Sequence, residues 1–230
     1  MWHPQLEALP EFRSIVVDLP GHGPSHDVKW GSFSDTAEKL VAVLDTAAVS
    51  DPVHVVGMSL GAVTALHVMA AVRERIGRAV LTGTVAKPLS RLMTWANLAV
   101  GALTQVPGAE GLVGRALQLP PEARAGFSEA GLGLDRRSWS RINDELHGEC
   151  LPEGLEQIDR PTLLLAGEKE QTIVLDSLGI LRRQLPVAEA RLAPDCHHAW
   201  SGEKPELFSA TVAAWVRGQP LPSELLDLPK

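Results

Sequence analysis

Residues 53–72 read VHVVGMSLGAVTALHVMAAV, and this stretch decides the fold. Its first six residues form a short, β-branched apolar run that is typical of a buried strand. From residue 60 onward the sequence is rich in Ala, Leu and Met and contains no proline, as expected for a buried helix. Between the two stands Gly57-Met58-Ser59-Leu60-Gly61, a G-x-S-x-G motif at the point where a strand gives way to a helix. The sequence therefore predicts a sharp turn that presents the Ser59 hydroxyl outward.

Glycines stand two positions before and two positions after this serine. The turn is expected to be strained, and a side chain at Gly57 or Gly61 is expected to collide with the neighbouring strand or helix backbone. The start of the helix also directs main-chain N–H groups, of which that of Leu60 is the nearest, toward a developing oxyanion. A helix-capping serine with packing glycines is the plainer alternative.

Strands and helices alternate on both sides of this stretch. Further strands are expected at residues 14–19, 78–84, 162–167 and 189–194, and helices are expected to begin after Ser32 and at Pro205. This order predicts an α/β fold with a mostly parallel sheet covered by helices on both faces. Residues 85–155 show helical spacing and no strand-like run. We therefore expect a core at 1–84 and 156–230, a helical lid at 85–155, and a loosely held tail from residue 220.

Three segments resemble the α/β-hydrolase superfamily, in particular its serine esterases: residues 18–25 (DLPGHGPS), the turn at Ser59, and residues 161–170 (PTLLLAGEKE). In that family the catalytic triad follows the chain order nucleophile, acid, base. The resemblance implies that Ser59 is the nucleophile, that the acid follows the strand at 162–167, and that the base lies near the C-terminus.

The acid position of the family is matched by Gly-Glu-Lys-Glu at residues 167–170, which places Glu170 where the family more often has Asp. Glu168 and Asp176 remain alternatives, because one sequence does not show which carboxylate points at the imidazole.

Residues 194–208 (PDCHHAWSGEKPELF) resemble the family's terminal segment, and their register favours His198 over His197 as the base. His198 would take the proton of Ser59. A carboxylate behind it would fix the tautomer of the imidazole and stabilise the imidazolium.

The family also has an apolar strand ending in His-Gly before the segment that resembles residues 2–6, and this sequence shows no such strand. The implied fold is N-terminally reduced, because that strand lies between those expected at 14–19 and 53–58. Its loop supplies a second oxyanion N–H, whose loss can cost about 100- to 1000-fold in rate.

Three explanations of this departure are open. We favour a start upstream of Met1, which predicts roughly 30 further residues with a β-rich run ending in His-Gly. The alternatives are direct pairing of residues 14–19 with 53–58, and a strand supplied by another chain.

Composition excludes several functions. The chain has 230 residues, of which 45% are hydrophobic and 21% charged, enough for one large core. Its net charge of -7 gives no general attraction to nucleic acid or anionic lipid. The apolar stretches are shorter than the ~20 residues of a membrane span. The start does not read as a signal peptide, and Cys150 and Cys196 make no disulfide framework, so a cytoplasmic protein is expected.

Together these features predict a serine hydrolase that cleaves a carboxylic ester or thioester of a small molecule through an acyl-enzyme. Met58, Met93 and Trp95 are candidates for an apolar substrate pocket, although for the last two we favour packing of the lid on the body. No cofactor is expected, and no metal site, because the adjacent histidines lack spaced partner ligands.

Three other functions remain open. A carbon–carbon bond hydrolase or a lyase would use the same triad. A non-catalytic binding protein on the same scaffold is the alternative from a different class. An enzyme that is complete only as a homo-oligomer is the third.

Overall fold

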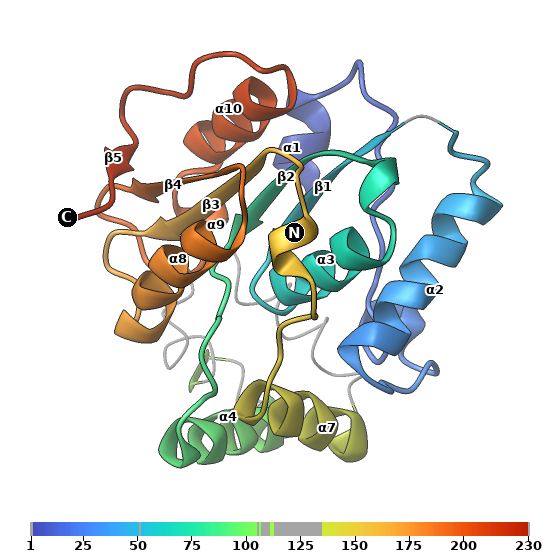
Figure 1. Cartoon of the computed structure of the whole chain (residues 1–230). Coiled ribbons are helices and arrows are strands. Elements are labelled where there is room, and N and C mark those ends of the chain that lie inside the picture. The colour runs from blue at the N-terminus through green and yellow to red at the C-terminus, as the bar shows by residue number, and fades with distance from the viewer. Residues whose placement is uncertain (1, 51, 105, 107–110, 113–134, 230) are drawn as a thin grey trace.

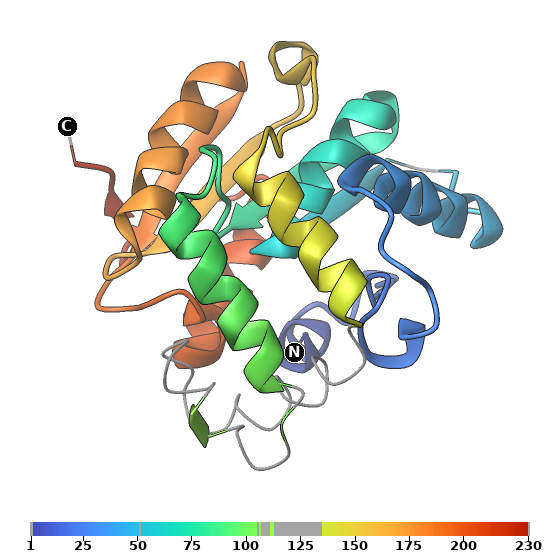
Figure 2. The ribbon, with the colours of Figure 1, turned by 90° about the horizontal axis from the view of Figure 1, so that it is seen from below.

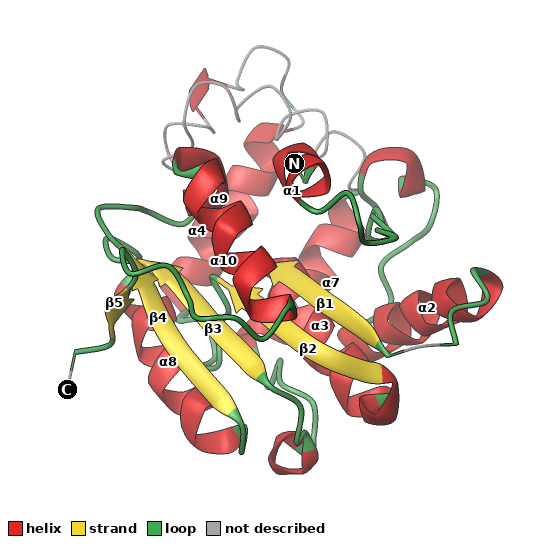
Figure 3. Cartoon of the chain, turned by 90° about the horizontal axis from the view of Figure 1, so that it is seen from above, coloured by secondary structure: helices red, strands yellow, loops and turns green. Residues whose placement is uncertain are grey.

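The computed structural model describes residues 2–50, 52–104, 106, 111–112 and 135–229. Its centre is a five-stranded sheet with the order β1-β2-β3-β4-β5. The strands are β1 (Val53–Met58), β2 (Ile76–Thr82), β3 (Thr162–Gly167), β4 (Ala188–Ala193) and β5 (Leu226–Asp227). The first four strands are parallel and β5 pairs antiparallel with β4 (Figure 3). The predicted mostly parallel sheet is confirmed, and β2 begins two residues earlier than expected.

Helices cover both faces of this sheet (Figure 1). One face carries α3 (Leu60–Ala71), α8 (Thr172–Gln184) and, packed on α3, α2 (Phe33–Thr46); the other carries α1 (His3–Ala8), α9 (Trp200–Glu203) and α10 (Pro205–Val216). Short 3-10 turns occur at Gly23–Ser25, Arg73–Arg75 and Leu155–Gln157. Alternate residues of β2 serve the two cores: Ala79 and Leu81 lie in the first, and Val80 lies in the second with Trp200 and Phe208. A strand buried on both faces requires this division.

Two helix starts follow their sequence signals. Ser32 caps α2, and its hydroxyl accepts the Asp35 N–H at 3.0 Å. α10 begins at Pro205, where a missing N–H leaves no helical hydrogen bond unmade. Both predictions are confirmed because they depend only on residues within one turn.

The strand predicted at residues 14–19 is wrong. Residues 13–19 have no regular secondary structure, and Ile15, Val16 and Val17 are 38%, 52% and 37% exposed. Among the described residues β1 pairs with β2 alone, so the direct pairing of 14–19 with 53–58 is also wrong. A β-branched run becomes a strand only where a second backbone completes its hydrogen bonds. No described segment offers that backbone to residues 14–19.

Both ends of the described chain are better held than the sequence suggests. The unpredicted helix α1 packs on α10, where the Gln5 amide donates to the Ser209 hydroxyl at 3.0 Å. β5 pairs with β4 and Leu225 is buried, so the expectation of a loose tail is wrong there. These contacts join residues far apart in sequence and leave no local pattern.

Between β2 and β3 the described residues include the helices α4 (Arg91–Thr104) and α7 (Arg136–His147). They lie side by side at one end of the sheet (Figure 2), and the Trp139 indole N–H donates to the Asn97 carbonyl at 3.0 Å. The described residues between 83 and 161 include no strand, as expected for a helical insertion. Much of the middle of the predicted insertion, including residues 113–134, lies outside the described residues. The role of this insertion as a lid remains a prediction.

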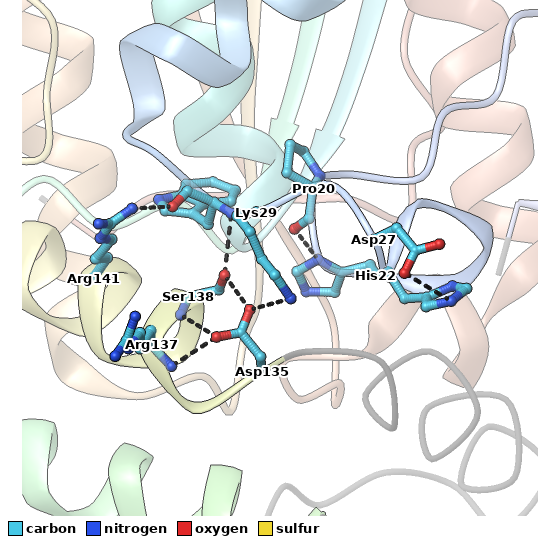
Figure 4. Close-up of polar contacts among 10 residues, drawn as sticks. Pro20, His22, Asp27, Lys29, Asp135, Arg137, Ser138 and Arg141 are labelled. Carbon is cyan, nitrogen blue, oxygen red and sulfur yellow. Dashed lines mark hydrogen bonds and ion pairs between the residues drawn. The ribbon is translucent and has the colours of Figure 1, made fainter.

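The helix α7 is attached to residues 29–30, which follow the turn at residues 20–25 (Figure 4). The Trp30 N–H donates to the Ser138 hydroxyl at 3.1 Å, and the Trp30 carbonyl accepts from Arg141 at 3.0 Å. Lys29 pairs at 3.3 Å with Asp135, the cap of α7. A hydrogen bond from Ser138 is the main cause that lowers the pKa of Asp135 to about 2. These contacts fix α7 to the body of the protein.

Candidate active site

Ser59 occupies the turn between β1 and α3, at φ 53° and ψ -119°. A residue with a side chain rarely adopts a positive φ of this kind, and the strain is about 1–3 kcal/mol. The backbone is held by three hydrogen bonds: the Ser59 N–H donates to the Thr82 carbonyl at 2.9 Å, and the Ser59 carbonyl accepts from Ala62 and Val63 at 2.9 and 3.2 Å. The predicted strained turn is confirmed.

The two glycines of the motif have different surroundings in the structure. A Cβ at Gly57 would lie 2.6 Å from the Gly61 carbonyl oxygen and 2.8 Å from the Ala62 Cα. A Cβ at Gly61 would meet no atom within 4 Å beyond its own helix and chain neighbours. The crowding predicted at Gly57 is confirmed, and the crowding predicted at Gly61 is absent.

We therefore expect Gly57→Ala and Gly61→Ala to change the free energy of unfolding in opposite directions. The first forces backbone against backbone and should lower the free energy of unfolding by about 1–3 kcal/mol. The second replaces a flexible residue in α3 and should raise that free energy by up to about 1 kcal/mol. Urea unfolding of the two variants, each against the parent chain, measures both changes. Equal destabilisation by the two substitutions would contradict this account of the turn.

Leu60 is the first residue of α3, so its N–H lies in the turn whose amides have no acceptor within the helix. This is the position expected for a donor to an oxyanion formed at Ser59.

The three candidates for the apolar pocket have different surroundings. Met58 is half-buried, and its Sδ accepts a hydrogen bond from the Ser201 hydroxyl of α9 at 3.4 Å. Met93 on α4 is half-buried, whereas Trp95 on the same helix is 71% exposed. Met58 directly precedes Ser59 in the chain. The pocket role of all three residues remains a prediction.

His198 and Glu170 form a pair, with 2.7 Å between His198 Nδ1 and Glu170 Oε2. The side chain of Glu170 is only 2% exposed, and its second oxygen accepts the Gln171 N–H at 3.0 Å. A carboxylate that accepts from Nδ1–H leaves Nε2 of the imidazole free to accept a proton.

The alternative acids and the alternative base have other partners. Glu168 is exposed and accepts the Asp195 N–H at 2.8 Å, and Asp176 pairs with Lys87 at 2.7 Å. His197 turns toward a different carboxylate, as described below. Within the described structure Glu170 is the one of the three carboxylates in contact with His198.

The end of β2 connects the serine turn to the histidine loop. The Thr82 carbonyl accepts the Ser59 N–H, and the Thr82 hydroxyl accepts the indole N–H of buried Trp200 at 2.7 Å. At the next residue, Gly83, the backbone has φ +66°, and a Cβ would lie 2.7 Å from His198 Cε1. Ser59 therefore contacts Thr82 and His198 contacts Gly83, and these two contacted residues are consecutive at the end of β2.

This bridging role was not predicted from the sequence, in which Gly83 is marked only as a glycine at the end of a strand-like run. No hydrogen bond joins Ser59 Oγ to His198 in the part of the chain that the structure describes. Catalytic contacts of this kind are often long before substrate binds.

The two cysteines are free and buried. Burial raises the pKa of the Cys150 thiol to about 11 and also raises the pKa of Cys196, so both are neutral thiols near pH 7. Within the described residues, no three side chains of His, Cys, Asp or Glu are grouped to hold a metal ion. None of the described helices is long and apolar enough to cross a membrane.

Comparisons with known proteins agree with this geometry. A pimeloyl-[acyl-carrier protein] methyl ester esterase of Nitrosospira multiformis is 26% identical over 244 aligned positions, covering 94% of this chain and 89% of that protein. A protein of Haemophilus influenzae, provisionally named a 2-succinyl-6-hydroxy-2,4-cyclohexadiene-1-carboxylate synthase, is 36% identical over 84 residues, covering 36% of this chain and 33% of that protein.

Among solved structures, an esterase from Exiguobacterium antarcticum matches with a TM-score of 0.81 at 19% identity, over 94% of this chain and 86% of that one. A sequence profile of the alpha/beta hydrolase family matches residues 1–211. The chain therefore has the α/β-hydrolase fold and belongs to the alpha/beta hydrolase family.

Proposed function

We propose that this chain is a serine esterase, which hydrolyses a carboxylic ester or thioester of a small molecule through an acyl-enzyme on Ser59. The observation that carries the proposal is the pair formed by half-buried His198 and buried Glu170. The imidazole of this pair packs on Gly83, next to the residue whose carbonyl holds the strained Ser59.

In the acylation step Ser59 Oγ attacks the acyl carbon while its proton passes to Nε2 of His198. A bond forms between Oγ and carbon, and the carbonyl electron pair moves to the oxygen. The Leu60 N–H donates to this oxyanion. When the tetrahedral intermediate collapses, the bond to the leaving alcohol or thiol breaks and the leaving group takes the proton from Nε2.

In the deacylation step the same residues act on water. Nε2 of His198 removes a proton from the water, whose oxygen attacks the acyl carbon, and the proton then returns to Ser59 Oγ as the acid is released. Glu170 contacts Nδ1 throughout. It holds the tautomer that accepts at Nε2 and stabilises the imidazolium that forms in each half of the reaction.

The relatives support an acyl compound as the substrate. One curated relative is named a methyl ester esterase and one solved relative an esterase, each over more than 80% of its own length. A serine at the turn also favours attack by a hydroxyl group over attack by a carboxylate. The half-buried Met58 beside Ser59 supplies apolar surface for the acyl or alcohol group.

Labelling with a fluorophosphonate tests the proposal, and a panel of p-nitrophenyl esters of graded acyl length tests the bond type. We expect one equivalent of label per chain, located on Ser59 by peptide mass spectrometry, and hydrolysis of at least one ester. Labelling of Ser59 without hydrolysis of any ester would instead favour a carbon–carbon bond hydrolase or lyase with the same triad. An inert Ser59 together with no hydrolysis would make the chain a binding protein.

A further inference from the structure

The loop at residues 194–198, which carries His198, is held on one side by the segment that carries Glu170. The Glu168 carboxylate accepts the Asp195 N–H at 2.8 Å, and the Lys169 N–H donates to the Cys196 carbonyl at 2.8 Å. The loop also packs directly on the end of β3. A Cβ at Gly167 would lie 2.3 Å from the carbonyl oxygen of Cys196.

On its other side the loop is held by two consecutive residues at the end of α9. Glu203 accepts the His197 N–H through Oε1 at 3.0 Å, and its Oε2 lies 3.1 Å from Nδ1 of the His197 ring. Lys204 Nζ donates to the Pro194 carbonyl at 2.8 Å. Both oxygens of Glu203 are therefore engaged by the residue that directly precedes His198.

The hydrogen bonds on these two sides hold a loop whose backbone is strained. Asp195 has φ 60°, a conformation that persists in a residue with a side chain only when its surroundings hold it. A hydrogen bond from a backbone N–H to a carboxylate is roughly twice as strong as one between neutral groups. The Glu203 side chain is 20% exposed, so water competes for it only in part.

We propose that Glu203 is a positioning residue for the esterase reaction proposed above: by clamping the peptide N–H of His197 it sets the imidazole of His198 between Glu170 and Ser59. The inference rests on the proposed function. The consecutive residues His197 and His198 each pair with a carboxylate, and the two carboxylates have different roles. Glu170 orients the ring of the base, and Glu203 fixes the backbone that carries it. A misplacement of about 1 Å can cost on the order of 100-fold in rate.

Three variants separate the backbone contact from the ring contact. Glu203→Ala removes both, and we expect kcat on a p-nitrophenyl ester to fall about 10- to 100-fold, with KM changed less than about 3-fold. Glu203→Gln keeps an oxygen for the His197 N–H without the charge, and should lose only about 3- to 10-fold. His197→Ala keeps the backbone contact and should lose less than Glu203→Ala. Glu206→Ala, an exposed glutamate on α10, is the matched control and should retain the parent kcat.

The rate of fluorophosphonate labelling and the proton resonance of His198 Nδ1–H give two further readouts. Labelling should slow in parallel with kcat, and the resonance should shift or broaden in Glu203→Ala but not in Glu206→Ala. A purely structural role would lower the melting temperature of Glu203→Ala while leaving its labelling rate unchanged when measured well below that temperature.

The outcomes distinguish the two proposals. An unreactive parent chain would remove the proposed function. A reactive parent whose Glu203→Ala variant keeps full kcat would overturn the positioning role alone, as would a loss in His197→Ala equal to that in Glu203→Ala. If Glu203→Ala does not fold, Glu203→Gln decides: an unchanged kcat overturns the role, and a loss of about 3- to 10-fold at unchanged unfolding temperature supports it.

Discussion

Ser59→Ala is expected to reduce ester hydrolysis about 10⁶-fold and to abolish fluorophosphonate labelling. The substitution removes the hydroxyl oxygen that we propose attacks the acyl carbon, so no acyl-enzyme can form. The backbone conformation, with φ 53°, is held by main-chain hydrogen bonds that alanine keeps. The fold should therefore survive, and the remaining rate should reflect only binding and the oxyanion donor.

Single-turnover kinetics on the best ester of the panel measure this loss. Ser34→Ala is the matched control, because Ser34 is an exposed serine on α2 outside the site. We expect this control to keep the parent rate and the full label. Residual activity of more than about one hundredth of the parent rate in a folded Ser59→Ala would mean that a different nucleophile or water carries the reaction.

The serine turn could be predicted from the sequence because each of its signals is local. A strand-like run, a glycine two residues before the serine and a proline-free helix lie within 20 consecutive residues, and the φ of Ser59 has the strain that the motif implies. The absence of crowding at Gly61 could not be predicted from these local signals. Whether a Cβ collides depends on what the fold brings near it, and at that position nothing is close.

The stretch at 14–19 shows the same limit for a strand. Its β-branched composition is favourable, but a strand is a pairwise structure and the described residues give it no neighbouring backbone. At the C-terminal tail the sequence predicted too little structure instead of too much. Leu226–Asp227 forms a strand because it pairs with β4, more than 30 residues earlier in the chain.

The partners within the candidate site could be predicted in part. The resemblance implied that Glu170 follows the strand at 162–167 and that His198 lies near the C-terminus, and in the structure His198 Nδ1 lies 2.7 Å from Glu170 Oε2. The roles of Thr82, Gly83 and Glu203 could not be predicted, because each depends on the path of a loop from another part of the chain. Sequence spacing alone does not define such a path.

Glu170→Gln is expected to lower kcat by about 10³- to 10⁴-fold with little change in KM. The amide can donate to Nδ1 of His198, which favours the tautomer with its proton on Nε2. That tautomer cannot accept the proton of Ser59, and the imidazolium formed during acylation loses its buried counter-charge. Since Glu170 Oε1 accepts the Gln171 N–H, the amide oxygen can keep this contact and the loop should stay folded.

The two alternative acids serve as comparisons for this prediction. Asp176→Asn removes only a surface pair with Lys87, whose side chains are 48% and 45% exposed, and should keep the parent kcat. Glu168→Gln keeps an oxygen for the Asp195 N–H and should lose less than about 10-fold. A loss in either of these variants that exceeds the loss in Glu170→Gln would assign the triad acid elsewhere. If Glu170→Gln has the largest loss, the carboxylate that contacts Nδ1 in the structure is also the one that acts in catalysis.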